Sequence, residues 1–450
     1  MKIVRKYLLR FLVLIIGARK IYREKIIDGK LFSQKAKVSD LVQLIKHAKQ
    51  KVPYYKNHLP KMDFKEKSIF KSFAQMNFKL QRSVLKEDIS QVMDPNVIEP
   101  GNFIDNRHSL LKNLTKVFRS NLLIPLNTGG SSGNPLHFYR TKESGIVFLL
   151  QFIECAKYHG WEEGEAFMVC MQEGVYSQLG LIKKVLSLFG FPMFMFKRID
   201  KQCAQRFIKL LNKSKPTIIF SFPSYLSELS VHLQNQQSEP KSKIKAILCA
   251  GEMLFDHQRK MMEDVFKTKI YNLYGSNEMG LMAMECKKQN NLHIFEKYVY
   301  LENDNKGQIL GTTLGEFYMP LIKYNVGDKG IIKLEKCSCG IKGKKIINLE
   351  GRIEEYLISG KRKKVYASYL RQLILKANED FNNSILRVQF VQKKSGKLIF
   401  YIQLIDKSQE KAVLQRLISR LKNDLHLKVS GKIVDKLFQK KGKFKFLIRE

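Results

Sequence analysis

Short apolar runs alternate with helical stretches between residues 121 and 350, and this alternation constrains the fold more than any other feature. The runs at 166–170, 217–220 and 246–249 are almost wholly apolar and have the length of buried strands. Strands covered on both faces have this composition, and helices must then shield the sheet. The pattern therefore predicts an α/β fold with mixed, mostly parallel sheets and covering helices.

One stretch shows the repeating unit most clearly. The apolar run at 246–249 is followed by residues 257–266, whose apolar side chains recur at helical spacing, and then by a second run at 270–274. A helix between two buried strands carries the chain back across the sheet, so the two strands pair in parallel. We expect a strand, helix, strand unit here.

Both flanks of this region differ from it. Residues 1–120 are basic and helical in pattern, with a turn predicted at residues 52–55. Residues 353–450 place strands and helices in an α+β order, which is enough chain for a small separate domain. The strands are expected at 386–390 and 398–402, and the helices at 369–376 and 409–425.

The chain is strongly basic, with 80 Lys and Arg against 41 Asp and Glu and a formal net charge of +39. Such an excess attracts polyanions such as nucleic acid, acidic lipid, nucleotides or anionic glycans. The basic residues are spread over the whole chain, so a general lysine-rich composition explains them equally well. No recognisable nucleic-acid-binding module accompanies the charge, and we expect no nucleic-acid partner.

The first residues contain the longest apolar stretch. Residues 7–17 are interrupted by Arg10 and fall short of the ~20 residues that a spanning helix needs. No signal-peptide cleavage pattern follows, and seven cysteines are too few for a disulfide framework. We therefore expect a cytoplasmic protein. Residues 1–25 form either an interfacial helix on the inner face of an anionic membrane or an ordinary amphipathic helix packed on its own domain.

A glycine- and hydroxyl-rich segment at residues 128–135 follows the apolar run at 122–126. Glycines let backbone N–H groups approach an anion, and hydroxyls add donors, which suits a polyphosphate. The segment lacks the Gly-Lys-Ser/Thr of a Walker A loop and the G-x-G-x-x-G of a dinucleotide fingerprint. By itself it is also compatible with a flexible connection.

Four further motifs follow in order: Tyr274-Gly275-Ser276-Asn277-Glu278, Tyr324-Asn325-Val326-Gly327-Asp328, Gly351-Arg352-Ile353-Glu354-Glu355 and Gly442-Lys443-Phe444. From about residue 50 onward, this ordered set resembles the adenylate-forming enzymes, and within them the phenylacetate–CoA ligase and CapK-like branch. Local stretches that carry the branch resemblance are Pro53-Tyr54-Tyr55, Thr128-Gly129-Gly130-Ser131, Phe222-Pro223-Ser224 and Pro320-Leu321-Ile322-Lys323-Tyr324.

The resemblance implies an organisation and an activity. A helical segment at 1–50 would precede a large adenylation domain at 51–351 and a mobile C-terminal lid at 352–450. The enzyme would convert a carboxylic acid and ATP, with Mg²⁺, to an acyl-adenylate and pass the acyl group to a thiol such as coenzyme A or a carrier arm. CapK-like relatives are associated with capsule or surface-polysaccharide synthesis. A different class remains open: a non-catalytic peripheral membrane scaffold of the same fold in glycan assembly.

The resemblance also assigns roles to single residues. Asp328 would accept hydrogen bonds from the ribose hydroxyls, and Glu278 would bind Mg²⁺. Arg352 would reach the ribose or α-phosphate, and Lys443 would lie between the substrate carboxylate and the α-phosphate. The β- and γ-phosphates would bind Thr128, Gly129, Gly130, Ser131, Ser132 and Gly133, the adenine would bind the Tyr274, Gly275 and Ser276 stretch, and Glu354 or Glu355 would lie at the hinge.

Each assignment has a plainer alternative. Asp328 sits in a sequence typical of a hairpin turn, Glu278 could begin a helix, and Lys443 could be a solvated charge in a lysine-rich tail. The chain also departs from the family pattern. Leu136 replaces the usual basic residue after the loop's proline, Lys323 replaces the usual arginine before Tyr324, and Gly129 stands at the second position of the loop. These departures predict an altered phosphate site.

A second constellation consists of Cys286, His293, Cys337 and Cys339, with Gly340 after the last cysteine. Two cysteine and histidine segments of this spacing can close a tetrahedral zinc site, and members of the same branch show a similar arrangement. Such a closed site would be structural. The remaining cysteines, Cys155, Cys170, Cys203 and Cys249, lie in apolar segments and are predicted to belong to the core.

Overall fold

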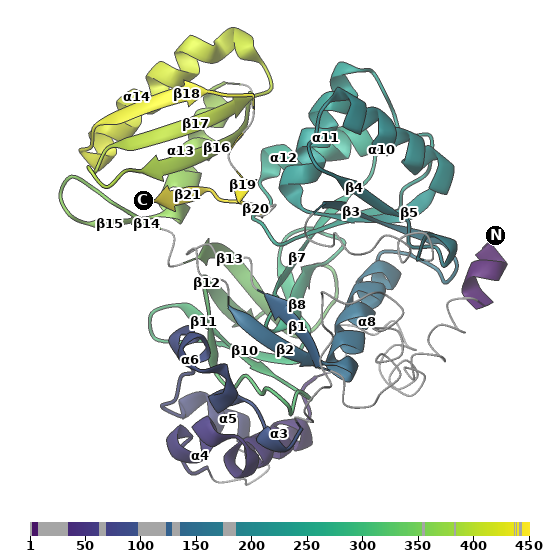
Figure 1. Cartoon of the computed structure of the whole chain (residues 1–450), viewed down its shortest axis with the longest axis vertical. Helices are drawn as coiled ribbons and strands as arrows, with labels where there is room; N and C mark the ends of the chain where they lie inside the picture. Colours follow the sequence, from purple (N-terminus) through teal and green to yellow (C-terminus); the bar gives the residue numbers. More distant parts are fainter. Residues whose placement is uncertain are drawn as a thin grey trace.

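The computed structural model describes residues 2–7, 35–62, 69–97, 123–127, 136–173, 186–352, 356–381, 384–435, 437, 439–440 and 443–450. A larger hydrophobic core draws on positions from Leu41 to Ile346, and a smaller one on positions from Leu357 to Leu447. We call the residues around these cores the large unit and the C-terminal unit (Figure 1). The predicted α/β fold with a smaller C-terminal α+β unit is confirmed. The sheets are mixed as expected but not mostly parallel, because six of the ten strand pairings in the 11-stranded sheet are antiparallel.

The large unit is built on an 11-stranded mixed sheet. Its strands are β3 Ala166–Gln172, β4 Met193–Phe196, β5 Pro216–Ser221, β6 Ala246–Ala250, β7 Ile270–Ser276, β8 Gly280–Glu285, β9 Leu292–Ile294, β10 Val299–Asn303, β11 Gln308–Thr313, β12 Tyr324–Leu334 and β13 Lys344–Arg352. The spatial order is β10-β11-β12-β13-β9-β8-β7-β6-β5-β3-β4. Pairing is parallel from β4 to β7 and antiparallel from β7 to β10.

Parallel pairing therefore ends where the alternation of strands and helices ends. The helices of this part are α8 Lys142–Tyr158, α10 Lys201–Ser214, α11 Pro223–Asn235 and α12 Asp256–Phe266. Figure 1 shows α10, α11 and α12 gathered over the parallel strands, with α8 on the other side. The predicted unit of strand, helix and parallel strand is confirmed as β6, α12 and β7.

Helix α10 shows how the sequence sets both ends and the packed face of these helices. The Asp200 carboxylate accepts a hydrogen bond from the Cys203 N–H at 2.9 Å and so caps the first turn. Cys203, Phe207 and Leu211 recur at helical spacing and are buried against the sheet. The helix ends at Lys215, whose φ of 47° is left-handed. The four cysteines predicted to belong to the core, Cys155, Cys170, Cys203 and Cys249, are all 0% exposed.

Short helices and a hairpin complete the large unit. The helices are α3 Val38–Lys51, α4 Pro53–His58, α5 Ile69–Gln75 and α6 Arg82–Glu87, followed by two 3-10 turns at Ile89–Val92 and Pro95–Val97. The turn predicted at 52–55 is wrong beyond Val52, because Pro53 begins α4 and fits the first turn of a helix. Strands β1 Leu123–Asn127 and β2 His137–Thr141 form an antiparallel pair.

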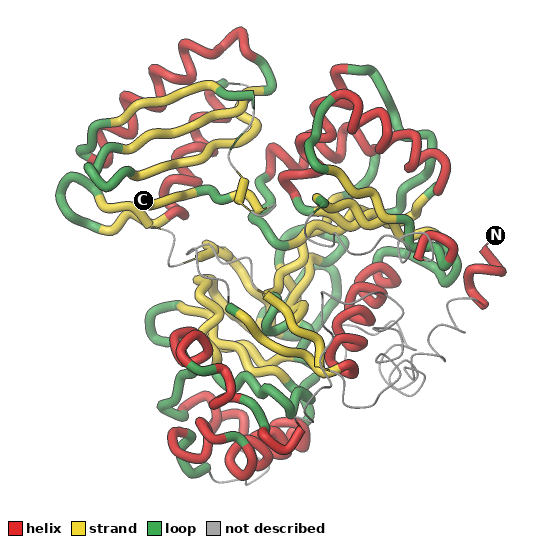
Figure 2. The backbone as a smooth tube through the Cα atoms, in the orientation of Figure 1, coloured by secondary structure: helices red, strands yellow, loops and turns green. Residues whose placement is uncertain are grey.

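The C-terminal unit packs two helices against a four-stranded sheet of order β18-β17-β16-β21. Its elements are β14 Tyr356–Ile358, β15 Lys364–Tyr366, α13 Ala367–Asp380, β16 Ile385–Gln392, β17 Leu398–Leu404, a 3-10 turn at Lys407–Gln409, α14 Glu410–Leu425, β18 Val429–Ile433, β19 Gln439–Lys440, β20 Lys443–Phe444 and β21 Leu447–Arg449. Figure 2 shows the helices and strands of this unit set apart from the large sheet.

The start of the chain is described only in part. Residues 2–7 are helical, and Lys2 Nζ lies 2.6 Å from Glu162 Oε2 of the large unit. Most of the predicted interfacial segment lies outside the described residues. Among the helices that the structure describes, none has both the length and the apolar character needed to cross a bilayer.

Candidate active site

Tyr274 and Asp328, which the motifs assign to the adenine and ribose of ATP, are in direct contact. The Tyr274 hydroxyl, near the end of β7, donates a hydrogen bond to Asp328 Oδ2 of β12 at 2.9 Å. Both residues are buried, with 8% and 7% of their surface exposed. In the sheet, β7 and β12 are separated by β8, β9 and β13. Only the folded chain therefore brings these two motifs together.

Asp328 lies in an extended strand. The alternative interpretation of residues 327–330 as a hairpin turn is wrong, because these residues belong to β12 and Asp328 is paired with Arg352 of β13. A Cβ at Gly330 would lie 3.1 Å from Ile346 Cγ2 and 3.2 Å from Ile309 Cδ1. The glycine thus serves close packing of the strand against the core.

Glu278 lies in the turn that joins β7 to β8 and is 8% exposed. The Tyr324 hydroxyl donates a hydrogen bond to Glu278 Oε1 at 3.3 Å, and Arg82 Nη2 of α6 is 3.6 Å from the same oxygen. The alternative of a helix start is wrong, since both neighbouring elements are strands. Tyr324 belongs to the motif at residues 324–328, but no sequence pattern indicated Arg82.

Two glycines flank this turn, Gly275 in β7 and Gly280 at the start of β8, and the backbone explains both. A Cβ at Gly275 would lie 2.4 Å from the carbonyl oxygen of Gly280, so a larger residue would push β7 and β8 apart. Gly280 has a φ of 80°, which is left-handed and favours glycine. The Met279 N–H donates a hydrogen bond to Ser276 Oγ at 3.2 Å. These contacts hold Glu278 at a fixed place beside β12.

Arg140 joins the same turn to β2, the strand after the glycine-rich loop. Its Nη2 donates a hydrogen bond to the Asn277 carbonyl at 2.7 Å, and its guanidinium carbon is 4.5 Å from the centre of the Phe148 ring. Burial lowers the pKa of Arg140, while the charges of Glu316 and Glu278 oppose that shift. Sequence reasoning missed this cation, because its role depends on a tertiary contact.

Two of the three departures from the family pattern lie in described residues, and they have different consequences. Leu136 is buried in the core, with 1% exposed, so this position supplies no cation to a phosphate. Lys323 Nζ donates to the carbonyl oxygens of Phe73 and Ala74, both at 3.0 Å, and to that of Met76 at 2.9 Å. Lys323 therefore anchors the end of α5, and its side chain has no part in the contacts of Asp328 and Glu278 given above.

Other predicted site residues are described in part or not at all. The backbone of Arg352 pairs with Asp328, and the backbone of Lys443 pairs with Lys440 in the β19–β20 hairpin. Figure 1 shows this hairpin extending from the C-terminal sheet toward the large unit. The predicted phosphate-loop residues Thr128, Gly129, Gly130, Ser131, Ser132 and Gly133 and the hinge residues Glu354 and Glu355 lie outside the described residues.

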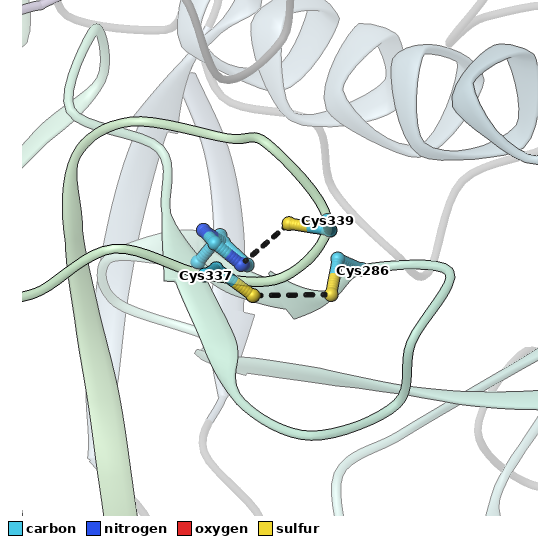
Figure 3. Close-up of side chains that lie close together, drawn as sticks. Cys286, Cys337 and Cys339 are labelled. Carbon is cyan, nitrogen blue, oxygen red and sulfur yellow. Dashed lines mark hydrogen bonds between the residues drawn. The ribbon is translucent and has the colours of Figure 1, made fainter.

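Cys286, His293, Cys337 and Cys339 meet where β8 and β9 lie beside the β12–β13 connection. Their ligand atoms all lie within 4.8 Å of one another. Cys286 Sγ is 4.0 Å from Cys337 Sγ, and Cys339 Sγ is 3.4 Å from His293 Nε2. Figure 3 shows the three cysteine side chains gathered around a common centre. The sequence constellation is thus assembled in space.

The separations of Cys286 from Cys337 and of Cys339 from His293 are close to those in a tetrahedral zinc site. With Zn–S bonds of about 2.3 Å and Zn–N bonds of about 2.0 Å, neighbouring ligand atoms are about 3.5 to 3.8 Å apart. Gly340 has a φ of 83° and its N–H donates to the Cys337 carbonyl at 3.0 Å, which closes the expected turn. The Ile341 N–H donates to Cys339 Sγ at 3.4 Å and would stabilise a thiolate there.

The electrostatics of the four residues also suit a cation. Burial, aided by the charge of Lys345, lowers the pKa of His293 to about 4. The imidazole is therefore neutral near pH 7 and has a lone pair for a metal. Burial, and then the neighbouring sulfurs of Cys337 and Cys286, raise the pKa of Cys339 to about 12, because a second thiolate beside them is unfavourable. A divalent cation would remove that repulsion.

Comparison with known proteins identifies the class. The AMP-binding enzyme family matches residues 86–318, and the chain belongs to this family. CapK from Staphylococcus aureus is 25% identical over 332 residues, which cover 70% of this chain and 72% of that protein. Phenylacetate-coenzyme A ligase from Thermus thermophilus is 23% identical over 209 residues, covering 43% and 46%. The predicted adenylate-forming superfamily and its CapK and phenylacetate–CoA ligase branch are confirmed.

Solved structures agree on the fold. 2-Hydroxyisobutyryl-CoA ligase in the postadenylation state with 2-HIB-AMP has a TM-score of 0.68 and 15% identity, over 92% of this chain and 88% of that chain. The same ligase with 2-HIB-AMP and CoA in the thioesterification state has a TM-score of 0.56 and 15% identity over the same shares. At this identity, both likenesses concern the fold alone.

Proposed function

We propose that this enzyme activates a carboxylic acid with ATP and then transfers the acyl group to a thiol, with coenzyme A as the first candidate. The contact of Tyr274 with Asp328 carries the proposal. It places the residue predicted for the adenine beside the carboxylate predicted for the ribose. Glu278, predicted for Mg²⁺, is linked to the same strand through Tyr324.

The first half-reaction joins the acid to AMP. A carboxylate oxygen attacks the α-phosphorus of ATP, the bond between the α-phosphorus and the α,β-bridging oxygen breaks, and pyrophosphate leaves. Both reactants are anions, so the site must supply positive charge where they meet. Lys443 would supply an ammonium there, and Arg352 would add a guanidinium at the ribose or α-phosphate.

The large unit would hold the nucleotide through its own residues. Asp328 has paired lone pairs that suit the two ribose hydroxyls. Glu278 offers a carboxylate to the Mg²⁺ that accompanies ATP, since that ion prefers oxygen ligands. Its contacts with Tyr324 and Arg82 would hold this carboxylate ready near the phosphates. The loop at residues 128–133 would bind the β- and γ-phosphates.

The second half-reaction would require a different arrangement of the C-terminal unit. A thiolate attacks the acyl carbon, the bond to the AMP phosphate oxygen breaks, and AMP leaves. We assign residues 1–50 to an N-terminal segment, 51–351 to the adenylation domain and 352–450 to the lid, with Glu354 or Glu355 at the hinge. The TM-score is higher with the postadenylation form than with the thioesterification form of 2-hydroxyisobutyryl-CoA ligase, and we take the arrangement here as that of the first half-reaction.

The cysteine and histidine cluster would have a structural part in this enzyme. Cys286, His293, Cys337 and Cys339 form a closed set of four ligands, which leaves no position for a substrate. A bound zinc ion would fasten the β12–β13 connection to β8 and β9. Because β12 also carries Asp328, the ion would help to fix the strand that holds the ribose.

The biological setting follows from the relatives by analogy. CapK supports a role in capsule or surface-polysaccharide synthesis, and the need for ATP and a free thiol supports a cytoplasmic location. Residues 1–25 would then hold the enzyme at an anionic membrane surface. Each of these points extends the proposed chemistry and is tested separately from it.

ATP–pyrophosphate exchange tests the activity directly. Purified full-length protein would be supplied with ATP, Mg²⁺ and one acid at a time from a panel of phenylacetate, benzoate, 2-hydroxyisobutyrate and medium-chain fatty acids. We expect acid-dependent exchange with at least one member, and thioester formation once coenzyme A is added. A folded, nucleotide-binding protein without exchange on any acid would favour the non-catalytic scaffold.

A further inference from the structure

A buried ion pair connects the two units. Arg387 of β16 in the C-terminal unit donates from Nη2 to Glu228 Oε2 of α11 in the large unit. The Arg387 side chain is 4% exposed and the Glu228 side chain 10%. Neither residue belongs to the motifs that suggest the adenylation chemistry. The pair therefore needs an explanation of its own.

The position of Arg387 shows that its burial depends on the large unit. Within β16, Val388 and Phe390 belong to the core of the C-terminal unit. Arg387 and Gln389 alternate with them and thus face the other side of the sheet, yet they are only 6% and 1% exposed. Contact with Glu228 shows that α11 covers this side at Arg387. If the units moved apart, Arg387 would meet water, whereas Gln389 would keep its hydrogen bond to the Lys445 carbonyl at 2.8 Å.

Two contacts surround the pair at the same boundary. Burial lowers the pKa of His257 on α12, and the neighbouring backbone of Leu386 opposes that shift, so α12 lies against the start of β16. Farther along, Arg371 of α13 donates to the Glu350 carbonyl at 3.3 Å in an exposed position. The buried charges thus lie on one side of the boundary, where α11 and α12 meet β16 (Figure 1).

A buried ion pair across a separable boundary acts differently from one inside a core. Burying two charges costs hydration, and good geometry offsets most of that cost without adding much stability. Removing one partner leaves the other charge buried and unpaired, which is strongly unfavourable. When two units separate, however, both charges return to water together. Such a pair therefore favours the relative orientation in which the two charges meet. It disfavours orientations in which either charge stays buried without its partner.

We propose that Glu228 and Arg387 are positioning residues that register the C-terminal unit in the adenylation arrangement and separate before thioester formation. This inference rests on the proposed two-step function. The ion pair forms in one arrangement of the units only. The inference therefore predicts that the pair favours one half-reaction over the other. A pair that served overall stability alone would affect both half-reactions alike.

Charge reversal tests the proposal. Glu228→Arg and Arg387→Glu each place like charges together, and the double variant restores the pair in the opposite sense. We expect each single variant to lower ATP–pyrophosphate exchange on the order of tenfold, while thioester formation from supplied acyl-adenylate is not lowered. The double variant should regain exchange. Glu228→Gln, which keeps the shape of the side chain, should shift exchange in the same direction but less.

A control separates this effect from general loss of charge. Arg416→Glu breaks the exposed ion pair with Asp380, at 3.3 Å, inside the C-terminal unit. It should change neither half-reaction. An equal loss in both half-reactions for Glu228→Arg, or no recovery in the double variant, would overturn the positioning role.

A second readout needs no catalysis. Spin labels at the exposed positions Lys241→Cys and Lys394→Cys lie one in each unit and report the distance between them. Each single reversal should shift or broaden that distance distribution, and the double reversal should restore it. Unchanged distances in Glu228→Arg would refute the registering role whatever the enzyme's activity. Distances that respond as expected, in a protein inactive on every acid of the panel, would refute the proposed function and leave the registering role standing.

Discussion

The carboxylates of the proposed nucleotide site and the ligands of the proposed metal site have different partners. Asp328 and Glu278 each accept a hydrogen bond from a tyrosine hydroxyl, at 2.9 and 3.3 Å. In the second site, three sulfurs and one imidazole nitrogen lie within 4.8 Å of one another, and Cys286 and Cys337 each donate from Sγ to Asn290 Oδ1 at 3.5 Å. The first group accepts hydrogen bonds from hydroxyls, and the second gathers four atoms of a kind that binds zinc.

This difference separates two kinds of contribution. Residues that already have partners can exchange them for a substrate at low cost, which suits a site that binds and releases ATP in every cycle. Thiols that repel one another when ionised gain most from a permanent ion. We therefore expect substitutions around Asp328 to change nucleotide affinity, and substitutions among the cysteines to change folding stability.

Replacing Cys337 and Cys339 together with Ser should have the largest effect. Structural zinc contributes on the order of 10 kcal/mol to the folding of small zinc domains, so loss of two ligands should release the ion and unfold part of the large unit. Metal analysis of protein purified without added zinc should fall from about one zinc per chain to none, with a lower melting temperature.

The matched control is Cys203→Ser, which alters a buried core cysteine of α10 and should keep the zinc. A wild-type preparation that is fully folded and free of metal would eliminate the zinc site. That result would contradict the metal site alone and would not bear on the nucleotide site.

Asp328→Ala should have a smaller effect, on affinity. A hydrogen bond to a charged group contributes roughly 1.5 to 3 kcal/mol, so losing the ribose contacts should weaken ATP binding roughly 10- to 100-fold. Calorimetric titration with ATP measures this, and the melting temperature without nucleotide should change little. Tyr274→Phe keeps the ring but removes the hydroxyl that contacts Asp328. An equal loss of affinity in both variants would show that this hydrogen bond matters more than the ribose contact.

Deleting residues 1–25 should affect the enzyme least. Basic residues near an anionic surface contribute on the order of 1 kcal/mol each, so the full chain should bind vesicles that contain anionic lipid, and added salt should weaken that binding. Exchange activity and zinc content should be the same in both chains. Equal vesicle binding by the full and truncated chains would count against a membrane role.

Sequence predicted the elements well where burial alone determines them. The apolar run at 246–249 became β6 Ala246–Ala250, and the helix expected at 257–266 became α12 Asp256–Phe266. Buried strands can be recognised in the sequence because almost every side chain in them must be apolar. The antiparallel pairing after β7 could not be predicted from the sequence, since strand direction depends on partners that lie far apart in it.

The candidate site shows the same limit. Motif order pointed to Tyr274, Glu278 and Asp328. In the structure Tyr274 contacts Asp328, and Glu278 is linked to the strand of Asp328 through Tyr324. Arg140 and Arg82 could not be found in this way, because a surface arginine and a buried one look alike until the fold is known. The family match ends at residue 318, so the roles of Asp328, Arg352 and Lys443 still depend on the motifs.

Lys443→Ala tests the central claim, a two-step enzyme with a mobile lid. If the ammonium stabilises charge only while the carboxylate attacks the α-phosphorus, the variant should lower acyl-adenylate formation roughly 10²-fold or more. ATP affinity should change little, and thioester formation from supplied acyl-adenylate should survive. Both rates would be measured on the same preparation. Equal damage to both half-reactions, or to neither, would contradict the role of Lys443 and the two-arrangement lid together.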